Sequence, residues 1–215
     1  MDNLTIIIDS IRQDLDARNE ARDEALKRSR DLIRLCSLSI RACHRHEFEQ
    51  ARELLAQVNA LAAEMTADLA DYPDLYYAGY TRDALKEVVE AHLVYALIHH
   101  DSLPTPEELN VPSSVYVGGL AEAATELRRF ILDLIRQDRL DEAEGYFAMM
   151  DEIYSTLVTI DFPDALTGGL RRQTDVVRGV TERTRGDLTV AVRQRRLEQA
   201  LQRVERMLEQ DNAKG

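Results

Sequence analysis

The sequence predicts an all-α protein with long helices near both ends of the chain. Only nine Gly and five Pro occur in 215 residues, and 45% of the residues are hydrophobic, so helix breakers are few and a sizeable core can form. Apolar residues recur at intervals of three and four along most of the chain, which is the period of an amphipathic helix. We therefore expect one helical domain over residues 1–215.

The first two helices are expected over residues 3–45 and about 47–70. One face of the first carries apolar residues at helical spacing: Ile7, Ile8, Ile11, Leu15, Leu26, Leu32, Ile33, Leu35, Leu38 and Ile40. The opposite face carries arginines interleaved with acidic residues: Arg12, Arg18, Arg22, Arg28, Arg30, Arg34 and Arg41. Two interpretations of that face are open, a solvated surface of salt bridges or a ridge that contacts phosphates.

The stretch DALKEVVEAHLVYALIHH, residues 83–100, is the most apolar part of the chain. Its central residues are apolar on nearly every side, which is typical of a helix buried in a bundle. Four polar residues interrupt it: Lys86, Glu87, Glu90 and His92. Glu87 and Glu90 are three apart and share one face of the helix, where a carboxylate needs a partner such as a cation.

A proline-rich loop over residues 101–114 separates this helix from the next, which is expected to run from Ser113 or Ser114 to about Gln137. Gly118 and Gly119 lie early in that helix, where glycine costs stability. We therefore expect another backbone to approach the helix closely at these positions.

The remaining chain predicts a helix over residues 139–160, a break at DFPDALTGG and a final helix from about 170 to 210. The last helix carries a narrow apolar stripe: Leu188, Val192, Leu197, Leu201, Val204 and Leu208. Such a stripe on a terminal helix indicates contact with a neighbouring helix or subunit.

Glu122 and Glu126 lie four apart in GGLAEAATELRRFILDLIR and also share one helix face. If this face meets that of Glu87 and Glu90, four carboxylates converge. Oxygen-only ligands suit Mg²⁺, Mn²⁺ or Ca²⁺ better than zinc. Neither pair is followed by the His of a Glu-x-x-His motif, which disfavours di-iron chemistry. Glutamate pairs at these spacings are also common on solvated helices, so spacing alone leaves both interpretations open.

The net charge is −12, and the basic residues are 24 Arg and only three Lys. An acidic, Lys-poor chain fits a protein adapted to high salt, and a GC-rich genome would also favour Arg over Lys. Binding of nucleic acid would depend on a local arginine patch. No apolar run is long enough to span a membrane, and the N-terminal residues lack the basic region of a signal peptide, so we expect a cytoplasmic protein.

The two cysteines, Cys36 and Cys43, are seven apart in one predicted helix. Two helical turns separate them by roughly 10 Å, which is too far for a disulfide bond. A metal cluster with the nearby His44 and His46 is an alternative, but the spacing matches no zinc pattern and favours buried thiols. No glycine-rich phosphate loop or Ser/His/Asp arrangement stands out either.

Four segments resemble the translin family, which includes translin and translin-associated factor X. DLDARNEARDEALKRSRDLIR resembles the family's first long helix, and FEQARELLAQV with the following DLYY resembles the second. LKEVVEAHLVYAL resembles the buried third helix, where the catalytic subunit carries Glu-x-x-Glu. YVGGLAEAATELRR, the most specific segment, resembles the family's Tyr-x-x-Gly-[apolar]-Ala-[Asp/Glu]-x-x-x-Glu-Leu. Residues 187–210 go beyond the resemblance and are expected to form a helical extension.

The resemblance implies a protomer of roughly seven helices that assembles into a closed barrel, and a Mg²⁺-dependent endoribonuclease acting on RNA inside it. The family's acidic residues correspond to Glu87, Glu90, Glu122 and Glu126. Glu122 stands where the catalytic subunit usually has Asp, and its side chain is one methylene longer, which bears on metal affinity and choice. Translin itself lacks the full set, so all four acids favour the nuclease subunit.

From this resemblance we expect a homo-oligomer, hexamer or octamer, that cleaves single-stranded RNA with Mg²⁺ or Mn²⁺. Single-stranded DNA is a further candidate ligand. The resemblance also favours the first helix as the RNA-contacting face, through Arg18, Arg22 and Arg30. The alternatives are a non-catalytic nucleic-acid-binding oligomer of the same fold and a helical scaffold that binds protein through its terminal stripe.

Overall fold

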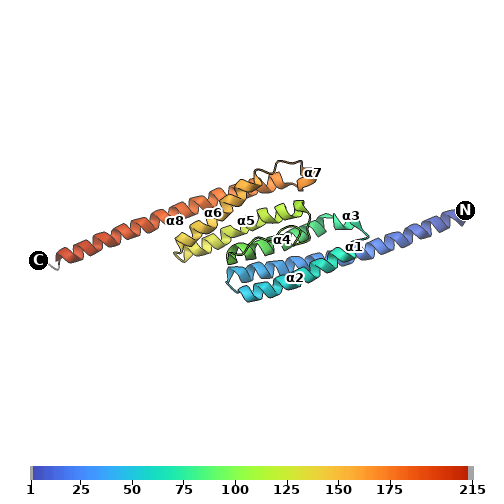
Figure 1. The fold of residues 1–215 in the computed structure, drawn as a ribbon, viewed down its shortest axis with the longest axis horizontal. Coiled ribbons are helices and arrows are strands. Elements are labelled where there is room, and N and C mark those ends of the chain that lie inside the picture. The colour runs from blue at the N-terminus through green and yellow to red at the C-terminus, as the bar shows by residue number, and fades with distance from the viewer. Residues whose placement is uncertain (1, 213–215) are drawn as a thin grey trace. The chain divides into compact units, whose positions relative to one another are not determined.

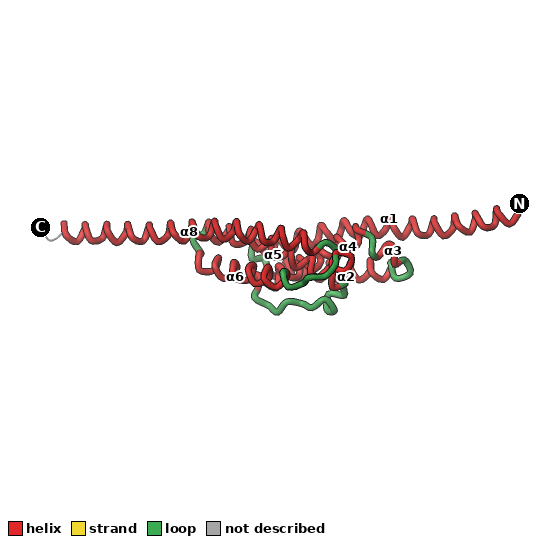
Figure 2. Tube along the Cα trace, turned by 90° about the horizontal axis from the view of Figure 1, so that it is seen from above, coloured by secondary structure: helices red, strands yellow, loops and turns green. Residues whose placement is uncertain are grey.

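The computed structural model describes residues 2–212, which form eight helices and no strand (Figures 1 and 2). The helices are α1 (Asp2–His44), α2 (Phe48–Asp68), α3 (Pro73–Tyr76), α4 (Gly79–His99), α5 (Ser113–Arg136), α6 (Leu140–Leu157), α7 (Asp164–Thr167) and α8 (Leu170–Asn212). Because α3 and α7 have only four residues each, six long helices carry the fold. The predicted all-α class and the long helices near both ends are confirmed.

The described residues fall into two compact units. The first contains residues 2–123 and 162–170, and the second contains residues 124–161 and 171–212. Helix α5 begins in the first unit and ends in the second, and the two units are described separately below. One domain over residues 1–215 stays a prediction.

Helix α4 is the centre of the first unit, where α1 and α2 pack against it and against each other (Figure 1). Its apolar side chains are buried on several sides, with Leu85, Val89 and Leu93 almost fully covered. The prediction that this helix is buried is confirmed. Its apolar length follows from its position, because a helix covered on several sides has little room for polar residues.

Helix α1 has two parts that differ in burial. From Ala25 onward its inner face is covered, and Leu32 and Cys36 are fully buried. The apolar residues nearer its start remain exposed: Leu4, Ile6, Ile7, Ile8, Ile11 and Leu15. Figure 1 shows the reason, since this part of α1 projects beyond α2 and α4.

The second unit joins α6 and α8 to the end of α5. Phe130 of α5 and Tyr146 of α6 meet edge to face with ring centroids 4.7 Å apart. Ion pairs hold α8 against α6, with Arg185 lying 2.9 Å from Asp151. Helix α8 continues past α6 (Figure 1), and its apolar stripe changes from buried at Leu188 to exposed from Leu197 onward.

The loop between α4 and α5 contains a turn near Pro106. The backbone N–H of Thr105 donates to the Glu108 carboxylate at 2.7 Å, and the N–H of Glu108 donates to the Thr105 hydroxyl at 3.2 Å. This reciprocal pair is a capping box, which satisfies backbone donors at the start of a turn. The Tyr116 hydroxyl then donates to the Pro104 carbonyl at 2.8 Å and ties the loop to α5.

Gly119 of α5 lies directly against α4. A Cβ atom at this position would lie 2.5 Å from Cβ of Val89 and 2.9 Å from the carbonyl oxygen of Lys86. The predicted close approach of another backbone is therefore confirmed at Gly119. The absent side chain lets the two helices pack with their backbones nearly in contact.

Within residues 2–212, none of the helices combines the length and the apolar character needed to cross a bilayer.

We predict that Gly119→Ala destabilises the protein by about 1–3 kcal/mol, because the added methyl overlaps a β-branched side chain and a backbone carbonyl. Gly186→Ala is the matched control, since Gly186 lies inside α8 with open space around its Cβ position. It should leave stability unchanged or raise it by up to about 1 kcal/mol. Urea unfolding of both variants measures the difference, and equal stability of Gly119→Ala and the parent would contradict the packing.

We predict that the protein loses stability as the pH falls from about 6.5 towards 4, in part through His92. The His92 Nε2 atom lies 2.7 Å from Asn59 Oδ1, and burial lowers the His92 pKa to about 4. Because this pKa is below the unfolded value, the contribution is complete above pH 6.5 and is lost as the pH falls. His92→Gln should reduce the pH dependence of the unfolding free energy by roughly 2–3 kcal/mol. Urea unfolding at pH 7 and at pH 4 tests this. If parent and variant lost the same unfolding free energy between the two pH values, the prediction would be contradicted.

Candidate metal centre

Helix α4 presents Glu87 and Glu90 on one face. They are three residues apart, so their side chains project from the same side of the helix, and both are half-buried. Their neighbours Val88, Val89 and Ala91 are buried. The two carboxylates therefore form a half-buried polar patch on a largely covered helix.

Helix α5 brings a third carboxylate to this face. Glu122 lies three residues after Gly119, which packs directly against Val89 and Lys86 of α4. One carboxylate oxygen from each of Glu87, Glu90 and Glu122 lies within 4.8 Å of the others. In the part of the chain that the structure describes, this is the one group of three or more His, Cys, Asp or Glu side chains with such spacing.

Glu126, the fourth predicted ligand, follows Glu122 by one helical turn on α5. Its side chain is 27% exposed and lies 3.9 Å from Arg129. Glu126 belongs to the second unit, whereas the three clustered carboxylates belong to the first. Its participation in the cluster therefore stays a prediction.

Lys86 is a member of the cluster whose role the sequence did not indicate. Its Nζ atom lies 2.9 Å from Glu122 Oε1 and 3.6 Å from Asp83 Oδ1. Burial alone would lower the Lys86 pKa, but the hydrogen bond to Glu122 and the nearby carboxylate charges outweigh it and raise the pKa. Lys86 is therefore charged and neutralises part of the negative charge. One signal was available, because the chain has only three Lys beside 24 Arg.

The two cysteines are buried thiols, as predicted. Cys36 is fully covered, and burial together with the charges of Glu87 and Glu90 raises its pKa. Burial raises the Cys43 pKa to about 12. Among the described residues, no Cys/His cluster with His44 or His46 has metal-ligand spacing. The donors at the candidate centre are therefore carboxylate oxygens.

The oxygen donors fit a hard divalent cation. Ligand oxygens around Mg²⁺ lie about 2.1 Å from the ion, so two opposite ligands are about 4.2 Å apart. A spacing of 4.8 Å or less requires only a small rotation of the side chains. The set includes no histidine or thiolate and therefore suits Mg²⁺ or Mn²⁺ better than zinc.

The predicted RNA-contacting arginines lie along α1. Arg18 pairs with Asp14 and with Asp74 at 3.0 Å each, and Arg22 pairs with Asp23 at 3.0 Å. Arg30 is exposed. Acidic partners already neutralise Arg18 and Arg22, which is the geometry of a salt-bridged surface. Contact of these three arginines with RNA stays a prediction.

The chain is similar to known proteins over nearly its whole length. It is 30% identical to the uncharacterized protein MJ0175 of Methanocaldococcus jannaschii over 213 residues, which cover 98% of this chain and 92% of that protein. Among solved structures, AfC3PO in complex with duplex RNA is 31% identical with a TM-score of 0.80, covering 87% of this chain and 97% of that one. AfC3PO solved separately gives the same identity and TM-score and is covered over 98% of its length.

Apo-NeC3PO is 23% identical with a TM-score of 0.78, covers 86% of this chain and 96% of that one, and supports the fold alone. No protein-family model matches the chain. The identity to AfC3PO over nearly all of its length, together with the shared fold, shows that this chain belongs to the translin family.

Proposed function

We propose that this protein is a metal-dependent endoribonuclease of the translin type that cleaves single-stranded RNA. The observation that carries the proposal is the cluster of Glu87, Glu90 and Glu122, in which two helices hold three carboxylate oxygens within 4.8 Å. Its relative AfC3PO has been solved with duplex RNA, which supports RNA as the ligand.

In this proposal Glu87, Glu90 and Glu122 hold Mg²⁺ or Mn²⁺, and Glu126 completes the set. When bound, the cation polarises a phosphoryl group and activates water for in-line attack on phosphorus. The half-buried carboxylates fix the position of the charge on two closely packed helices, so little reorganisation is needed. Lys86 adds positive charge at the edge of the cluster, where it attracts the negatively charged strand.

A non-catalytic RNA-binding protein of the same fold is the second candidate. It is favoured by the ion pair between Lys86 and Glu122, because a protein cation already balances one of the carboxylates. The two candidates differ in one measurable respect, since only the nuclease requires a divalent cation to cut RNA.

We predict that Glu87→Gln reduces metal-dependent RNA cleavage by at least about 100-fold, because a ligand to the cation is lost. Without metal the variant should melt at the parent's temperature or higher, since one of three like charges is removed. Glu64→Gln, at an exposed position of α2, is the matched control and should cut like the parent. The assay uses labelled single-stranded and duplex RNA with Mg²⁺, Mn²⁺ or EDTA. Cleavage by Glu87→Gln at the parent's rate would refute the nuclease proposal.

We further propose that the protein is a homo-oligomer whose copies meet through the projecting parts of α1 and α8. Leu4, Ile8, Ile11 and Leu15 follow a 4-3-4 spacing and are 38–59% exposed. The outer stripe of α8 repeats this spacing and is 47–61% exposed; its residues are Leu197, Leu201, Val204 and Leu208. Matching heptad stripes are what a pair of helices needs to pack as a coiled coil.

Charge selects the pairing between α1 and α8. Residues 4–18 carry three carboxylates and two arginines, whereas residues 190–208 carry five arginines and two glutamates. Two copies of α8 would repel each other, but α1 of one copy and α8 of another attract. Both stripes remain exposed within a single chain, so we place the contact between α1 of one copy and α8 of another. Such a contact joins two different surfaces and is therefore heterologous. When it is repeated from copy to copy, it forms a closed ring if the successive rotations add up to a full turn.

We predict that Ile8→Asp or Leu201→Asp lowers the mass of the assembly measured by light scattering, because either places an unpaired carboxylate in an apolar contact. Ser10→Asp and Gln199→Asp are the matched controls, since each adds the same charge to the same helix away from the stripe. The controls should keep the parent's mass. An unchanged mass for both stripe variants would overturn the proposed contact.

A further inference from the structure

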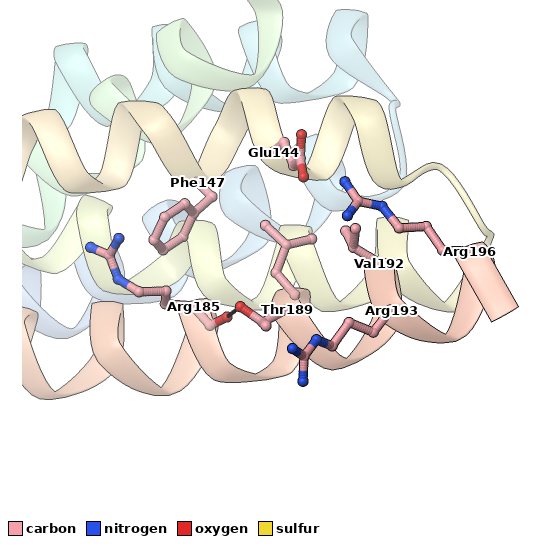
Figure 3. Close-up of a pocket in the computed structure, with 8 residues that line it drawn as sticks. Glu144, Phe147, Arg185, Thr189, Val192, Arg193 and Arg196 are labelled. Carbon is pink, nitrogen blue, oxygen red and sulfur yellow. Dashed lines mark hydrogen bonds between the residues drawn. The ribbon is translucent and has the colours of Figure 1, made fainter.

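The second unit contains a surface cavity of 390 Å³ between α6 and α8. Arg185 and the Phe147 ring lie at one end, with the guanidinium carbon 5.0 Å from the ring centroid (Figure 3). Arg196 extends towards Glu144 at the other end, and Thr189 and Arg193 lie on the α8 side (Figure 3). A cavity of this volume is in the range that holds a small organic ligand.

The cavity lies on the basic part of an acidic chain. Helix α8 carries ten arginines and seven carboxylates, a net charge of +3, whereas the rest of the chain carries −15. Residues 183–196 alone contain five arginines and one aspartate. The α8 side of the cavity is therefore basic, whereas α6 on the other side carries five carboxylates and no Arg or Lys.

Two of the arginines at the cavity have no acidic partner among the residues that the structure describes. Arg185 pairs with Asp151 at 2.9 Å, and the neighbouring Arg195 pairs with Asp141 at 2.8 Å. Arg193 and Arg196 form no ion pair or side-chain hydrogen bond with any residue between 2 and 212. They are three apart on α8, where like charges destabilise a helix, so an anion bound beside both relieves the repulsion.

The other lining groups indicate which chemical class of anion fits the cavity. Planar guanidinium groups favour phosphate, to which they donate two hydrogen bonds at once. Leu188 and Val192 supply an apolar surface next to Phe147. The Glu144 carboxylate accepts hydrogen bonds and disfavours a bare polyanion, but it suits a hydroxyl or amino donor attached to the phosphate-bearing body.

From these groups we propose that the cavity between α6 and α8 binds a nucleotide unit, with Arg193 and Arg196 on its phosphate. The phosphate comes either from an RNA strand that lies along α8 or from a free nucleotide. In the first case this inference deepens the RNA-binding part of the proposed function. In both cases the site is built from residues other than those of the carboxylate cluster, since all of its lining residues belong to the second unit.

The test compares two double variants that remove the same charge from the same helix. Arg193→Gln/Arg196→Gln, the cavity pair, alters the cavity, and Arg171→Gln/Arg172→Gln, the control pair, alters exposed arginines near the start of α8, outside the segment proposed to pair with α1. Binding of a labelled single-stranded RNA is followed by fluorescence anisotropy in EDTA over a range of salt concentrations. EDTA separates binding from cleavage, so failure of the nuclease proposal does not affect this result.

The cavity pair should raise the RNA Kd at least about tenfold and should reduce the slope of log Kd against log salt concentration by about one to two. The control pair should change Kd less than about threefold. Titration with a nucleoside 5′-monophosphate and with inorganic phosphate identifies the source. Saturable nucleotide binding that the cavity pair abolishes assigns a free nucleotide, and loss of RNA binding alone assigns the strand. Equal effects of the two pairs on RNA, with no nucleotide binding by the parent, would overturn the inference.

Discussion

The close contact between α4 and α5 at Gly119 is the constraint on which the candidate site depends. Val89 and the Lys86 carbonyl fill the space that a side chain would occupy. The contact holds the Glu122 side of α5 against the Glu87 and Glu90 side of α4, and one carboxylate oxygen from each of the three lies within 4.8 Å of the others. Gly119 therefore helps to position the carboxylates, although it is not itself a candidate ligand.

Grouping three carboxylates has an electrostatic cost, which explains the presence of Lys86. Two unit charges about 5 Å apart repel by about 3–4 kcal/mol at an effective dielectric constant of 20, and partial exposure lowers this value. Lys86, on the same helix as two of the carboxylates, offsets part of this repulsion through its contact with Glu122. A fold that keeps such a group half-buried must supply positive charge, either from its own side chains or from a bound cation.

The sequence predicted the long helices and named the three carboxylates that the structure brings together, and it failed where contacts alone decide the outcome. Local periodicity predicted α4 as a buried helix, and a costly glycine pair predicted the approach at Gly119. Periodicity did not distinguish the exposed Ile8 and Ile11 from the buried Leu32, because a stripe looks the same whether its partner is in the chain or in another copy. The role of Lys86 was not predicted, because an ion pair between two helices produces no periodic pattern in the sequence of either helix.

The separation of charge within the chain bears on how an acidic protein binds nucleic acid. A net charge of −12 acts at long range, but salt screens it beyond roughly 8–10 Å, so a bound strand responds mainly to the groups it touches. Arginines on α1 are interleaved with acids and several are paired, whereas those beside the α6–α8 cavity exceed their acidic partners. The seven arginines of α1 include several held in salt bridges on its surface, whereas in our proposal two of the ten arginines of α8 bind a phosphate. Position relative to acidic neighbours, more than arginine content, decides which helix binds a polyanion.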